Sequence, residues 1–273
     1  MSPLNAGAVC AIARQEFVRV LTYPLIPVVA FIVFLIALLD GTGYASSLEG
    51  VGISNGPDVL IFGFTRSWES TAMICSIVAI FLGATSILYE RWNSSLNVLL
   101  TKPLYRRDYY IGKFLGLSGF MLFLFNAFTI LLVSLTIVFY MEPQSGSEFA
   151  LRVSSYIFIT TLSCSLVLAL SMFFGVLSKN ILLVTSLSVI YTFFDWIWHP
   201  ERIMGGLSEF TPQQLYFRLI GPKGITDPAA LFNTLVPFDR WLNAAIPLLI
   251  FVLLEMLALL LIGICLFSRE DSV

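Results

Sequence analysis

Long apolar runs separated by short polar stretches dominate this chain of 273 residues. A helix needs about 20 apolar residues to cross a hydrocarbon layer about 30 Å thick. Six runs approach this length, at about 21–44, 70–88, 114–140, 153–177, 180–198 and 244–267. The pattern therefore predicts an all-α, polytopic membrane protein with six transmembrane helices.

Composition excludes the class of water-soluble globular proteins. Hydrophobic residues make up 58% of the chain and charged residues 12%, and the mean hydropathy of +0.90 lies far above soluble averages. No internal repeat is strong enough to indicate an inverted-repeat secondary transporter. We therefore expect one transmembrane domain over residues 1–273.

The distribution of basic residues predicts the orientation in the membrane. An even number of spans places both termini on the same side. That side holds nine of the fifteen Lys and Arg residues and the opposite side holds six. Because Lys and Arg concentrate in cytoplasmic loops, we expect a multi-pass protein of the plasma membrane with both termini in the cytoplasm.

Residues 89–113, between the second and third spans, form the most strongly charged stretch of the chain. A helix over 92–101 would be amphipathic, and the proline at position 103 would end it. Its apolar arc would hold Trp92, Leu96, Leu99 and Leu100. Such a helix can lie on a lipid surface or fill a groove in a partner protein, and periodicity does not distinguish the two.

The N-terminal segment 5–23 is predicted to form a short helix before the first span. Glu16 interrupts its apolar face and is placed to pair with Arg19 at i+3 or to meet a partner protein. An interfacial anchor without any contact role is an equal alternative.

The 45 residues from His199 to Asn243 interleave turn signals with apolar residues, so we expect short exterior helices between the last two spans, lying at or dipping into the outer leaflet. Trp241 fits an interfacial aromatic belt at the end of this loop.

Two acidic residues fall inside the spans. Asp195 lies near the outer membrane surface, and its position favours an interfacial structural role. Glu255 lies near the middle of the last span. Contact with a substrate or proton and simple helix association are equally favoured roles for Glu255.

A search for catalytic chemistry finds no motif. His199 is the only histidine, the four cysteines are scattered singly, and the GxSxG and HExxH patterns are absent. The phosphate-binding pattern GxxxxGK[ST] is also absent, since Gly112-Lys113 is followed by Phe. We expect no catalytic residue, no metal, no cofactor and no nucleic-acid partner, and therefore a protein that is not itself an enzyme.

Residues Gly83 to Gly116 resemble a segment of ABC-2 type permeases. In that family an acidic-basic pair ends span two, an LLxxP motif follows, and an arginine and a Gly-Lys pair precede span three. The matching positions here are Glu90-Arg91, Leu99 to Pro103, Arg106 and Gly112-Lys113. The N-terminal segment is similar to the family's cytosolic connecting helix, with Glu16 at its acidic position. The chain resembles the small permeases that are coupled to separate ATPases, such as those of the sodium-efflux and nitrous-oxide-reductase-maturation types.

This resemblance implies that the ATPase is a separate subunit and that a coupling helix at about 91–102 contacts it. The implied coupling residues are Glu16, Glu90, Arg91, Trp92, Leu96, Leu99, Leu100, Arg106 and Arg107. It further implies a type V exporter with two permeases, as a homodimer or heterodimer, in the lipid bilayer, and any exterior accessory protein would be another chain. A membrane subunit that only transmits force to an exterior protein, or a secondary transporter, is the alternative.

Overall fold

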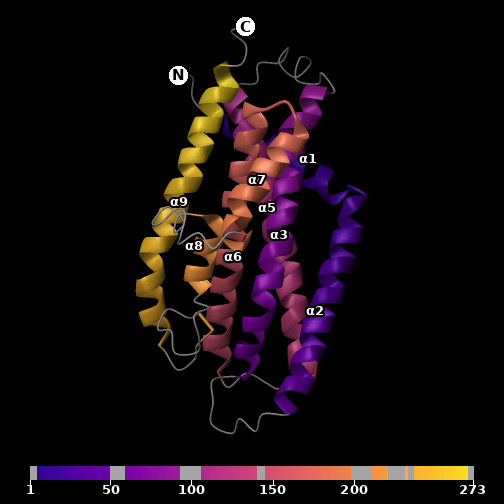
Figure 1. Ribbon diagram of the computed structural model, residues 1–273, viewed down its shortest axis with the longest axis vertical. Helices are drawn as coiled ribbons and strands as arrows, with labels where there is room; N and C mark the ends of the chain where they lie inside the picture. Colours follow the sequence, from indigo (N-terminus) through magenta and orange to yellow (C-terminus); the bar gives the residue numbers. More distant parts are fainter. Residues whose placement is uncertain are drawn as a thin grey trace.

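The computed structural model describes residues 5–49, 59–92, 106–139, 145–197, 211–220, 231–232 and 237–269 (Figure 1). Within these ranges all regular structure is α-helical, which confirms the predicted fold class. The helices are α1 Ala6–Leu21, α2 Leu25–Glu49, α3 Val59–Trp92, α5 Arg106–Phe139, α6 Gly146–Leu177, α7 Ile181–Ile197, α8 Pro212–Ile220 and α9 Phe238–Arg269.

The described helices identify a polytopic helical membrane protein. Three of them are long and apolar enough to cross a bilayer on their own: Arg106–Leu135, Gly146–Leu177 and Phe238–Ser268. A fourth candidate joins α1 to the first part of α2 across a bend of 69°, and shorter apolar helices cover Met73–Tyr89 and Ile181–Phe193. Each of the six predicted apolar runs therefore corresponds to a helix of the structure.

The helices extend beyond the predicted spans. The third span was expected from about 114, but α5 begins at Arg106, and the second was expected from about 70, but α3 begins at Val59. The predicted spans were shorter than the helices because hydropathy marks only the apolar part of a helix, whereas the helix itself continues into flanking polar residues. The first span starts later than expected, at Leu25, because the Thr22–Pro24 turn separates α1 from α2.

Helix α6 forms the centre of the molecule, since it packs against α3, α5, α7, α8 and α9. Its buried residues come from every side of the helix between Ile159 and Met172. A continuous buried face on all sides is typical of a central helix, and the surrounding helices bury their inner stripes against it.

The short helix α8 is the element expected between the last two spans. It lies about half-way along the bundle and contacts α6, α7 and α9 (Figure 1). Leu215, Tyr216, Leu219 and Ile220 of α8 are all buried. Trp241 of α9 donates a hydrogen bond from Nε1 to the carbonyl oxygen of Leu219 at 3.1 Å. Helix α8 is therefore part of the packed core.

Candidate functional site

Close packing of α1 against α5 depends on two glycines of α5. A Cβ atom at Gly116 would lie 2.5 Å from the carbonyl oxygen of Ala13 and 2.9 Å from the Cβ of Glu16. A Cβ at Gly112 would lie 2.8 Å from the Cβ of Ile12. Only glycine allows the two backbones to approach this closely. The same approach brings the side chain of Glu16 over α5.

Glu16 makes a buried ion pair across this contact. Its Oε1 lies 2.9 Å from Lys113 Nζ of α5, and the two side chains are only 5% and 1% exposed. The same oxygen lies 2.9 Å from a guanidinium nitrogen of Arg19, one turn further along α1. A buried charge is stable only when it is paired, so Glu16 and Lys113 hold each other in place.

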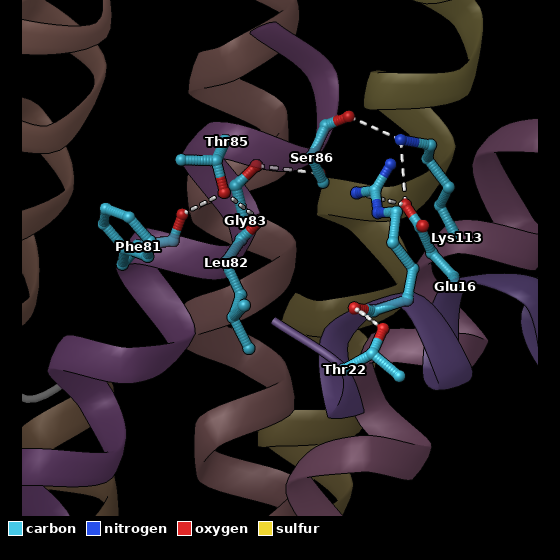
Figure 2. A network of polar contacts seen from close by, with 9 residues as sticks. Glu16, Thr22, Phe81, Leu82, Gly83, Thr85, Ser86 and Lys113 are labelled. Carbon is cyan, nitrogen blue, oxygen red and sulfur yellow. Dashed lines mark hydrogen bonds and ion pairs between the residues drawn. The ribbon is translucent and has the colours of Figure 1, made fainter. Parts of the chain in front are cut away.

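Lys113 extends the network to a third helix. Its Nζ donates a hydrogen bond to the backbone carbonyl oxygen of Ser86 on α3, as Figure 2 shows. The ammonium group also lies 5.3 Å from the ring centroid of Tyr109, which adds a cation–π contact. We call the set Glu16, Arg19, Lys113 and Ser86 the three-helix node, because it joins α1, α5 and α3.

The first turn of α5 adds further links at the same end of the bundle. The Asp108 carboxylate is 1% exposed and accepts hydrogen bonds from the backbone nitrogen of Asn5 at 3.3 Å and from Arg107 Nε at 3.2 Å. Arg106 donates to the carbonyl oxygen of Phe267 at 3.3 Å. The start of α1 and the end of α9 thus meet at the start of α5, as expected for an even number of spans.

Helix α3 is fixed to the central helix below the node. Ser171 Oγ of α6 donates a hydrogen bond to the carbonyl oxygen of Ile80 at 2.8 Å. A Cβ at Gly83 would lie 2.7 Å from the Cβ of Ser171. This close approach shows that α3 and α6 pack tightly against each other at this level.

A separate polar contact joins α7 and α9 within the apolar part of the helix bundle. The Tyr191 hydroxyl of α7 donates to Glu255 Oε1 of α9 at 3.3 Å. The second carboxyl oxygen of Glu255 is buried and has no hydrogen-bond partner within the described residues. Asp195 belongs to α7, shortly after Phe193, where the backbone departs from helical geometry, and its side chain is not described.

The family model for the ABC-2 family transporter protein matches residues 10–272. The chain belongs to the ABC-2 family. This match confirms the family expected from Gly83 to Gly116 and from the N-terminal helix. The comparison with curated proteins finds no match. An ABC-2 protein of this kind is a membrane-spanning transport subunit.

The structure describes part of the coupling set that the sequence predicts. Glu16 pairs with Lys113 of α5, and Arg106 and Arg107 lie in the first turn of α5, about 10 Å along that helix from Lys113. Glu90, Arg91 and Trp92 form the last residues of α3, directly after the node, and their side chains are not described. The predicted coupling residues Leu96, Leu99 and Leu100 lie outside the described residues.

Sequence reasoning missed Lys113, Ser86 and Asp108 as partners of this set. Lys113 was noticed only as part of a Gly-Lys pair and Asp108 only as a charge. A glycine beside a lysine at the start of an apolar run was the available signal, since the glycine permits close approach and the lysine then needs a buried acid. Among the described residues, no group of three His, Cys, Asp or Glu side chains is arranged to hold a metal.

Proposed function

We propose that this ABC-2 protein is the transmembrane permease subunit of an ATP-driven exporter, and that a separate ABC ATPase binds its coupling helix at about 91–102 and helix α1. The observation that carries the proposal is the three-helix node. It joins the two helices that flank residues 93–105 to each other and to α1.

The node lies close to both ends of the segment proposed to receive the ATPase. Ser86 is six residues before Trp92, about 9 Å along α3, and Lys113 is seven residues after Arg106, about 10 Å along α5. Force applied to the segment therefore reaches α3 and α5 within two turns. The Glu16–Lys113 ion pair makes α1 follow, and the Ser171–Ile80 bond passes the movement to α6.

A pair of matched variants tests this assignment. Leu96→Asp places a carboxylate on the apolar arc of the coupling helix, and Asn97→Asp places the same group on its polar side. Removing apolar area from a protein interface costs about 25 cal/mol per Å². Leu96→Asp is expected to weaken co-purification of the ATPase, whereas Asn97→Asp is expected to retain it, with both variants inserted in the membrane at normal levels.

Unchanged ATPase stoichiometry and ATP hydrolysis in the Leu96→Asp complex would contradict the coupling assignment. Normal, coupled ATP hydrolysis without movement of any solute would instead support the subunit that only transmits force. Co-purification from the native membrane, with identification of the bound chains, distinguishes a homodimer from a heterodimer and detects any exterior accessory protein.

We also propose that both termini face the cytoplasm of a cell with this protein in its plasma membrane. The nine-to-six distribution of basic residues supports this orientation. Ser54→Cys and Gly224→Cys are expected to react with a membrane-impermeant thiol reagent added outside intact cells, and Ser94→Cys is expected not to react. Labelling of Ser94→Cys from outside would reverse the orientation.

A further inference from the structure

A cavity of about 390 Å³ lies between the turn that joins α1 to α2, the adjacent face of α3 and the first residue of α7. Its volume falls within the range of small-molecule binding sites. The lining residues are Arg19, Val20, Tyr23, Ile26, Val29, Ile77, Val78, Phe81, Leu82, Thr85, Leu88, Tyr89 and Ile181. Figure 2 shows part of this wall, with Phe81, Leu82 and Thr85 on α3.

Polarity changes along the length of this cavity. Arg19, Tyr23 and Tyr89 lie at its α1 end. From Tyr89 to Ile77 the wall extends over twelve residues of α3, about 18 Å, and its deeper part is apolar. The cavity therefore offers charged and phenolic groups at one end and hydrocarbon at the other, which is the polarity profile of an amphiphile.

The polar end is suited to an acidic group. The Arg19 side chain remains 41% exposed although it pairs with Glu16. Guanidinium groups bind phosphate and carboxylate with two parallel hydrogen bonds. Tyr23 and Tyr89 also line the cavity, are about half exposed and carry hydroxyl groups that can donate. Tyrosine and arginine at this position are also typical of the level of lipid headgroups.

We infer that this cavity is a binding site for an amphiphile of the bilayer, with one acyl chain along α3 and an acidic headgroup at Arg19. Ile77 and Phe81 are partly exposed, so a chain can enter from the side. The inference goes beyond the proposed function, because binding of this ligand needs no ATPase and no transport.

The test uses the full chain in nanodiscs of phosphatidylcholine that contain a small fraction of phosphatidic acid with a diazirine in mid-chain. After irradiation, labelled peptides are mapped by mass spectrometry. Labelling of residues 26–29 and 77–82 is expected to saturate with probe and to be competed by unlabelled phosphatidic acid. Ile77→Trp fills the cavity and is expected to reduce this labelling about fivefold or more. The matched control Ile250→Trp, at an exposed isoleucine of α9, is expected to leave it unchanged.

The headgroup is tested with the same diazirine chain on phosphatidylcholine. The wild-type cavity is expected to prefer the phosphatidic acid probe about threefold or more. Arg19→Gln is expected to remove this preference, whereas Arg14→Gln, an exposed arginine of α1 outside the cavity, is expected to keep it.

The proposed site would be contradicted if labelling of the cavity did not saturate and was no stronger than labelling of the outer face of α9 at Leu254 and Leu261. Occupation of the cavity by a second copy of the chain, seen as crosslinks between cysteines placed there, would also contradict it. Saturation and competition are measured on the wild-type protein, so the result does not depend on whether Ile77→Trp folds.

Discussion

Two buried cations stabilise the two ends of this molecule in different ways. Lys113, at the α1 end, pairs with a buried acid from another helix and donates to a carbonyl of a third. Arg152, near the start of α6 at the other end, pairs with Glu148 on its own helix at 2.7 Å and donates to the carbonyl oxygen of Leu231.

The difference lies in what each cation holds. The Glu148 side chain is 37% exposed, so water can solvate it, and its pair with Arg152 is local to one turn. The Glu16 carboxylate is almost fully buried and depends on α5 for its partner. Lys113 therefore determines how helices are arranged around the proposed coupling segment, whereas Arg152 anchors Leu231, which follows α8 in the chain, to α6.

Lys113→Met should produce the largest effect, because it leaves Glu16 buried with its partner on α5 removed. Breaking one side of a buried ion pair costs up to about 3–5 kcal/mol, and Arg19, which stays 2.9 Å from the same Glu16 oxygen, offsets part of that cost. We expect a lower unfolding temperature in detergent and rapid proteolysis of α1. The double variant Glu16→Gln with Lys113→Met removes both charges and is expected to recover most of the stability. Equal instability of the single and double variants would show that the pair does not hold α1.

Gly116→Ala should also separate α1 from α5, by steric overlap with the carbonyl oxygen of Ala13. Overpacking of this kind costs about 1–3 kcal/mol. Gly119→Ala is the matched control, because a Cβ there meets only Phe17 at 3.9 Å. Hydrogen exchange of the α1 amides is expected to rise in Gly116→Ala and to stay unchanged in Gly119→Ala. The same exchange in both variants would exclude close helix approach as the reason for glycine.

Arg152→Met should disturb the other end and leave the three-helix node intact. It removes the bond to Leu231, and an unsatisfied buried carbonyl costs about 1–3 kcal/mol, while Glu148 regains water. Faster hydrogen exchange over α8, residues 212–220, with unchanged exchange over α1 is the expected result. Loosening of α1 in this variant would mean that the two ends are coupled through α6.

The sequence was sufficient to predict the helical elements, because apolar runs of membrane length leave few alternatives to a helix. It was also sufficient to indicate the pairing of Glu16 with Arg19, because their i+3 spacing places both residues on one side of α1. The sequence could not predict contacts between residues that are far apart in the chain. Lys113 meets Glu16 across ninety-seven residues of chain, and periodicity along one helix carries no information on which helix lies opposite.

Trp241 shows the same limit. The sequence prediction placed it at a membrane interface, but the side chain is 1% exposed and donates to Leu219 within the core. That prediction was wrong because a tryptophan at the start of an apolar helix has the same local pattern in both environments. Only the packing of α8 against α6 and α9, which no local pattern predicts, creates the buried carbonyl that its N–H satisfies.

Glu255 is expected to show the smallest effect and differs from Glu16, because it is a buried acid with no cation beside it among the described residues. A charged carboxylate near mid-membrane costs about 2.5–3.5 kcal/mol. We propose that Glu255 is protonated and contributes a hydrogen bond with Tyr191, whose hydroxyl donates to its Oε1. Glu255→Gln retains an acceptor and a donor, so assembly and most transport are expected to persist. Glu255→Ala removes the acceptor and is expected to lower stability by about 1 kcal/mol, seen as a lower unfolding temperature. If Glu255→Gln assembled normally but lost all transport, the carboxyl group would instead titrate or bind a cation during the cycle, in contrast to the fixed charge pair at Lys113.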